Sequence, residues 1–131
     1  MKALLMVLIL VVNCSIGLSQ VGTCTLTGSG NWNAGNASNK ATWSCTGIAS
    51  NNPNDLRGTS TIIIPTGLTL TINSNVTWYA SLIVSGVVVF DNQLNLGLTS
   101  NCSGYNIIIQ TGGNISDSGQ GSNDRLVICG N

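Results

Sequence analysis

Short bursts of aliphatic and β-branched residues, separated by Asn and Gly, are the feature that most limits what this chain can fold into. The stretch from Thr61 to Trp78, TIIIPTGLTLTINSNVTW, shows the pattern clearly and contains no charged side chain. From residue 59 onward, Gly or Asn interrupts nearly every burst, and Glu is absent from the whole chain. Because such a sequence cannot sustain a helix longer than a turn or two, we expect an all-β fold.

Alternation with period two predicts which side chains face the interior. Within Leu68–Ile72 the threonines alternate with Leu68, Leu70 and Ile72, which we expect to point inward. The segment Leu94–Leu98 repeats the alternation. Other runs are apolar at every position, as in strands that are covered on both faces or whose outer side chains stack. These runs are Ile62–Ile64, Val87–Val89 and Ile107–Ile109.

The spacing of the bursts indicates a repeat. Their centres at Ile63, Ile83, Ile108 and Val127 are separated by 20, 25 and 19 residues. Secondary bursts lie at Leu70, Val88, Leu96 and Ile115. A spacing of about 20–25 residues fits one coil of a parallel β-helix, a solenoid in which like residues stack between coils. The alternative is an antiparallel β-sandwich, but no Asn-Gly or Asp-Gly dipeptide marks a tight hairpin.

The first nineteen residues have the order of a secretory signal peptide. Lys2 precedes an apolar run from Ala3 to Val12, and small and polar residues follow up to Ser19. The run is too short to span a membrane as a helix, which takes about 20 residues. We therefore expect cleavage of residues 1–19, no transmembrane segment, and a secreted, extracellular or cell-surface protein. Residues 20–58 are expected to form an irregular, disulfide-containing cap, and residues 59–131 the β-helix coils.

The cysteines support export. Cleavage would remove Cys14 and leave four cysteines in the mature chain, and an even number in an exported protein predicts two disulfides. These four are Cys24, Cys45, Cys102 and Cys129. Three connectivities are open, and we favour Cys24–Cys45 with Cys102–Cys129, since the 27 residues between the latter two are close to one coil. Metal binding by these thiolates is not expected, because they are widely spread and the chain has no His.

The charged residues argue against several classes of function. The chain has four Lys and Arg, four Asp and Glu, and no His. So few and scattered cations cannot form a nucleic-acid-binding surface. Without His, the abundant Ser and Thr lack the usual base for acyl transfer. The carboxylates fall in four separate turns, at Asp55, Asp91, Asp117 and Asp124. We expect no catalytic pair, no enzymatic activity, no cofactor and no metal site.

Three tryptophans are the candidate ligand-stacking residues: Trp32, Trp43 and Trp78. Exposed indole rings would make the chain a carbohydrate-binding module, with surface glycans as partners. Alternatively, Trp32 and Trp43 fill the open end of the helix beside Cys24 and Cys45, because large aromatic residues more often serve the core. A weaker alternative is an ice-binding surface made of Thr-x-Thr pairs, which occur here at irregular spacing.

Several motifs resemble the N-terminal head region of secreted Bacteroidetes-type surface proteins. They are GSGNWN, ATWSCTG, IIIPTGLTLTINSNV and LIVSGVVVFDN, and the tail NIIIQTGGNISDSGQGSNDRLVICGN is similar to rungs of the same family. The resemblance covers nearly all of the expected mature chain. It implies a right-handed parallel β-helix, placement at the cell surface, and a structural or adhesin-like role. It departs from the family pattern before the first strand, where Thr59 and Ser60 replace an expected Asp.

The last predicted strand, Arg125–Cys129, lies close to the final residue, Asn131. A terminal coil without a cap leaves backbone groups unpaired. We therefore expect self-association through this coil, or pairing with a continuation of the chain.

Overall fold

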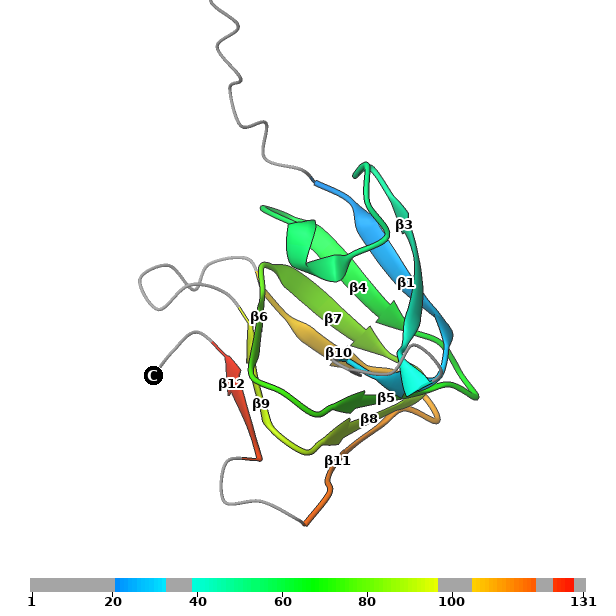
Figure 1. Ribbon diagram of the computed structural model, residues 1–131, viewed down its shortest axis with the longest axis vertical. Helices are drawn as coiled ribbons and strands as arrows, with labels where there is room; N and C mark the ends of the chain where they lie inside the picture. Colours follow the sequence, from blue (N-terminus) through cyan, green and yellow to red (C-terminus); the bar gives the residue numbers. More distant parts are fainter. Residues whose placement is uncertain (1–20, 33–38, 97–104, 120–123, 129–131) are drawn as a thin grey trace, which may run out of the picture.

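The computed structural model describes residues 21–32, 39–96, 105–119 and 124–128, which form β-strands and one short 3-10 helix, η2 (Pro53–Asp55) (Figure 1). This confirms the all-β prediction. The strands are β1 (Thr23–Gly28), β2 (Gly30–Asn31), β3 (Thr42–Thr46), β4 (Ser60–Ile64), β5 (Thr69–Ile72), β6 (Val76–Trp78), β7 (Ala80–Val84), β8 (Val87–Phe90), β9 (Gln93–Leu96), β10 (Ile107–Ile109), β11 (Asn114–Asp117) and β12 (Arg125–Ile128).

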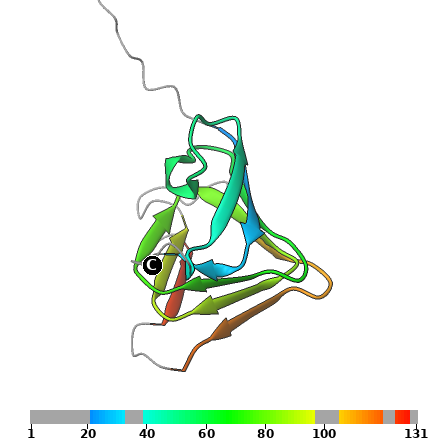
Figure 2. The same ribbon diagram turned by 45° about the vertical axis from the view of Figure 1, so that its right-hand side comes forward.

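The strands form three sheets whose orders are β10-β7-β4-β1-β3, β11-β8-β5-β2 and β12-β9-β6. Figures 1 and 2 show these sheets as three walls around a common interior. From β4 onward, each strand pairs with the strand three places later in the chain. We call each set of three consecutive strands, one per sheet, a circuit: the first is β4–β6, the second β7–β9 and the third β10–β12. Strands β1 and β2 form a partial circuit ahead of the first.

The pairing pattern decides against the antiparallel sandwich. Among the described strands, all pairings are parallel except that of β1 with β3. Parallel neighbouring strands need a long connection. The chain supplies it by adding one strand to each of the other two sheets before it returns to the first. A sandwich of hairpins would instead place consecutive strands antiparallel to each other.

The registers match part of the predicted repeat. Ile63 pairs with Ile83 and Ile83 with Ile108, so the first three burst centres stack in one sheet. The prediction for the fourth burst centre was wrong, because Val127 does not stack with the other three centres. It pairs with Asn95, in the sheet that contains β12. The reason is that the third circuit is longer than the first two. A spacing close to one coil, counted from Ile108, therefore ends in the sheet of β12 and does not return to the sheet of β10.

The interior is a ladder of apolar side chains. Leu70 and Ile72 are buried as predicted, whereas Leu68 lies at the corner before β5 and is half-buried. In β4, β7 and β8, buried and half-buried positions alternate, so the runs with apolar residues on both faces do have an inner and an outer side. The fully buried set includes Ile62, Ile64, Leu70, Ile72, Trp78, Leu82, Val84, Val88, Leu94 and Leu96.

A glycine corner joins the first two walls. In the first circuit the Leu68 amide donates to the Pro65 carbonyl at 3.2 Å, and Gly67 has φ +81°. This is a four-residue turn whose third position requires positive φ. At the same corner of the second circuit, a Cβ on Gly86 would lie 2.2 Å from the Pro65 oxygen. Glycine at residue 86 therefore allows the circuits to stack closely.

The segment 20–58 is not an irregular cap in its described part. It contains β1, β2 and β3, and β1 and β2 extend two of the sheets by parallel pairing with β4 and β5. The stacked sheets thus begin at Thr23 rather than at residue 59. The sequence concealed this because β1 and β2 are Thr- and Gly-rich and lack the bursts of the later strands. Strand β3 folds back and pairs with β1 in the antiparallel direction. In this pairing Cys45 of β3 lies directly opposite Cys24 of β1.

Candidate functional site: a polar groove beside the tryptophan cluster

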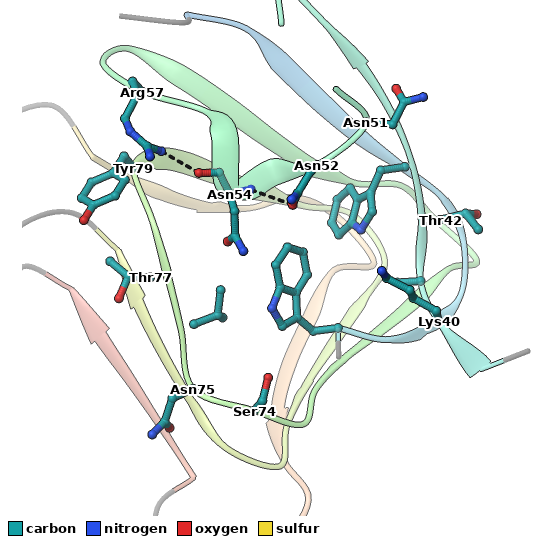
Figure 3. Close-up of a pocket in the computed structure, with 14 residues that line it drawn as sticks. Lys40, Thr42, Asn51, Asn52, Asn54, Arg57, Ser74, Asn75, Thr77 and Tyr79 are labelled. Atoms are coloured by element: carbon teal, nitrogen blue, oxygen red, sulfur yellow. Dashed lines mark hydrogen bonds between the residues drawn. The ribbon is translucent and has the colours of Figure 1, made fainter. Parts of the chain in front are cut away.

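A groove of about 830 Å³ lies at the end of the molecule that carries β3 (Figure 3). One wall is the segment 51–57, which contains η2, and the opposite wall is the segment 74–79, which contains β6. Strand β6 is the outermost strand of its sheet in the described structure, so no described strand covers it on this side. The lining residues are Trp32, Lys40, Ala41, Thr42, Trp43, Asn51, Asn52, Asn54, Arg57, Ser74, Asn75, Val76, Thr77 and Tyr79.

The rings of the three tryptophans pack against one another beside this groove. The ring centroids of Trp32 and Trp78 are 5.0 Å apart, those of Trp32 and Trp43 are 6.0 Å apart, and all three pairs are edge-to-face. Such geometry stabilises aromatic pairs beyond their buried area. The structure thus brings together residues that lie in three different segments of the sequence.

Their roles differ. Trp78 is 0% exposed, so it cannot stack on a ligand, and naming it as a possible ligand-stacking residue was wrong. The cause is its register in β6, where it pairs with the buried Leu96 and continues the inward ladder. Trp32 and Trp43 are half-buried and line the groove, which is compatible with both roles considered from the sequence, core filling and ligand stacking.

The disulfide between Cys24 and Cys45 fixes the strand that carries Trp43. The two Cα atoms are 4.1 Å apart, and the residues face each other across β1 and β3. This confirms the first half of the predicted pairing. Cys102 and Cys129 lie outside the described residues.

Local hydrogen bonds shape the wall 51–57. The Asn52 side chain caps η2 by accepting from the Asn54 amide at 3.1 Å, and Pro53 follows at the first helical position. The Asn51 side-chain oxygen accepts from the Cys45 amide at 2.9 Å, which ties the wall to β3. Pro53 and Leu56 are buried beneath it. The wall is therefore anchored at both the strand and the core.

Arg57 closes this wall. Its Nη1 donates to the carbonyl oxygens of Asn54 and Leu56, both at 2.6 Å. Its guanidinium lies over the Tyr79 ring, with 4.8 Å from Cζ to the centroid, a cation–π contact across the groove to the opposite wall. Lys40 is the second cation of the lining, and no carboxylate is found among the described lining residues.

The aspartates show one association that sequence reasoning missed. The Ser118 hydroxyl lies 3.0 Å from Asp91 Oδ1 and 3.2 Å from Asp124 Oδ2, so two of the predicted separate turns meet at one serine. Stacking of the second and third circuits produces this contact. Asp117 and Asp55 have local partners, the Gly119 amide and the Ser50 hydroxyl. In the described part of the chain, no group of three or more His, Cys, Asp or Glu side chains that could hold a metal ion is found.

No helix among the described residues is both long and apolar enough to cross a membrane. Comparisons of the chain with protein-family models, with curated proteins and with solved structures found no match.

Proposed function

We propose that this chain is a non-catalytic structural or adhesive module of the extracellular space or cell surface, built as a right-handed parallel β-helix. The observation that supports it best is the stack of parallel circuits around one continuous apolar ladder. Such a solenoid contributes an extended body with a long lateral surface for contacts. Right-handed winding is the hand that parallel crossovers adopt almost without exception.

Extracellular placement is supported by the disulfide between Cys24 and Cys45, because such bonds persist in oxidising compartments. The order of residues 1–19 as a secretory signal points the same way. The resemblance to the heads of Bacteroidetes-type surface proteins fits this role, and we propose kinship with them on the motifs given above.

The test is surface proteolysis. Intact source cells and their medium are probed with an antibody against the described β7–β8 segment, before and after protease treatment of the cells. We expect the protein in the medium, or a surface signal that protease removes without lysis. A signal that protease removes only after lysis would contradict the proposal.

Carbohydrate binding is the second candidate function, and the groove favours it. Trp32 and Trp43 offer half-buried indole rings beside a lining of amides and hydroxyls, a combination suited to the apolar faces and hydroxyl rims of sugars.

An ice-binding surface receives less support. Thr23 pairs with Thr61, which pairs with Ser81, whereas Thr25 pairs with Ile63. The Thr-x-Thr pairs therefore do not align into a flat rank of threonines across the stacked strands.

A further inference from the structure

We propose that the groove between segments 51–57 and 74–79 binds an acidic saccharide, one whose rings carry carboxylate or sulfate groups. This rests on carbohydrate binding, the second candidate function given above, and it names the class of glycan. The groove volume of about 830 Å³ lies in the range of ligand pockets, and would hold a short oligosaccharide.

Charge selects for an anion. Among the described residues that line the groove, both charged side chains, Lys40 and Arg57, are cationic, and none carries a carboxylate that would repel an acidic ring. Asp55 lies in η2, within the wall segment 51–57, but it is not among the described residues that line the groove, and its carboxylate accepts a hydrogen bond from the Ser50 hydroxyl. In a chain with three cations after residue 20, two of them at one groove is a marked concentration.

The amides add donors. Asn51, Asn52 and Asn75 use their side-chain oxygens to accept backbone amides, from Cys45 at 2.9 Å, Asn54 at 3.1 Å and Gln93 at 3.3 Å respectively. These bonds hold the side chains in place through their oxygens, and each amide group also carries two N–H donors beside the one lone pair that its oxygen retains. A donor-rich lining favours a ligand rich in acceptors, and hydrogen bonds to carboxylate or sulfate oxygens are the stronger kind.

The aromatic rings favour a saccharide over an acidic peptide. Trp32 and Trp43 are held edge-to-face against the buried Trp78, so their positions are set before a ligand arrives. A rigid aromatic surface costs little entropy on binding and packs against the C–H face of a sugar ring. Arg57, held by two carbonyls and the Tyr79 ring, places a cation in the lining of the same groove.

Binding of the full mature chain to a glycan array, followed by titration, tests the proposal. The probes are oligogalacturonate, its neutral methyl ester, sulfated and unsulfated chondroitin oligosaccharides, sialylated and asialo glycans, and an oligo-aspartate peptide. We expect binding to one or more acidic saccharides, and at least tenfold weaker binding to the matched neutral form and to the peptide. Equal binding of neutral and acidic forms, or of the peptide, would overturn the acidic saccharide class. Binding to no saccharide would overturn the groove as a glycan site while leaving surface proteolysis to decide the structural role.

Variants locate the site. Lys40→Gln should weaken binding of the acidic probe severalfold, and Lys40→Gln with Arg57→Gln by at least tenfold. Because Arg57 also holds two backbone carbonyls, the Lys40 variant carries the test if the double variant unfolds. Arg125→Gln is the matched control, since it removes an exposed cation from β12, in the third circuit. Loss of binding in Arg125→Gln equal to that in Lys40→Gln would place the site elsewhere.

Discussion

The two ends of the stacked sheets differ in how their inward side chains are covered. At one end, β3 folds antiparallel onto β1, the Cys24–Cys45 bridge locks the pair, and Cys24 and Leu26 are buried. At the other end, β10, β11 and β12 are the outermost described strands of the three sheets. There Ile109 and Ile128 are 54% and 46% exposed, although their register places them in the inward ladder.

The contrast shows that stacking neighbours, rather than residue type, decide burial in this fold. Ile64, Val84 and Ile109 occupy one column of the ladder, and their exposed fractions are 0%, 0% and 54%. Isoleucine therefore has opposite environments at the two ends of one column. The groove also lies at the covered end. There β3 and the segment 51–57 lie over the first circuit, but no described strand pairs with the outer edge of β6, and the groove lies beside that edge.

The largest effect is expected within that column. Ile64→Ala should lower the free energy of unfolding by about 4 kcal/mol, since it leaves a cavity between two stacked circuits. Ile109→Ala, the same substitution at the exposed end, should cost less than about 1 kcal/mol. Urea denaturation of both variants measures the difference. Similar losses for the two would mean that the exposed end is covered in solution.

The second largest loss of stability is expected when the disulfide is removed. Replacing Cys24 and Cys45 together by Ala is expected to cost about 3 kcal/mol, because the bridge closes a loop with a sequence separation of 21 residues. Hydrogen exchange should rise most in β1 and β3, which the bridge joins, and least in β10–β12. A rise in β10–β12 as large as that in β1 and β3 would contradict the comparison.

Substitution of two corner glycines tests the same comparison between the ends, with a smaller expected loss of stability. Gly67 and Gly112 both have positive φ, +81° and +85°, at equivalent turns of the first and third circuits. Alanine should cost about 1–2 kcal/mol at Gly67, where a Cβ meets no atom within 4 Å and only backbone strain acts. Gly112→Ala should cost less, because the exposed circuit can adjust its backbone. Thermal unfolding of the two variants ranks them, and a larger loss at Gly112 would reverse the comparison.

The smallest effect concerns self-association. The exposed isoleucines, and the outer edges of β10, β11 and β12 with which no described strand pairs, should give the chain a weak, concentration-dependent increase in mass by light scattering. Ile109→Lys should abolish the increase. Val21→Lys should not, although Val21 is 49% exposed, because it lies at the covered end. A wild-type chain that remains monomeric at high concentration would show that the exposed end does not self-associate.

Several features followed from the sequence alone. The period-two pattern determined that Leu70 and Ile72 face inward, and the spacing of the bursts brought Ile63, Ile83 and Ile108 into one stack. The cysteine at residue 24 was correctly assigned to Cys45. These succeed because side-chain alternation, burst spacing and short-range bridging are properties of the chain's own order.

Other features were decided only by the tertiary structure. The burial of Trp78, the meeting of Asp91 and Asp124 at Ser118, and the groove itself depend on which circuit stacks on which. The sequence contains β1 and β2 as polar stretches without bursts, and they become strands because β4 and β5 provide backbone partners. Local pattern fixes the face on which a side chain lies, but its neighbours in adjacent circuits fix whether that face is buried, exposed, or open to a ligand.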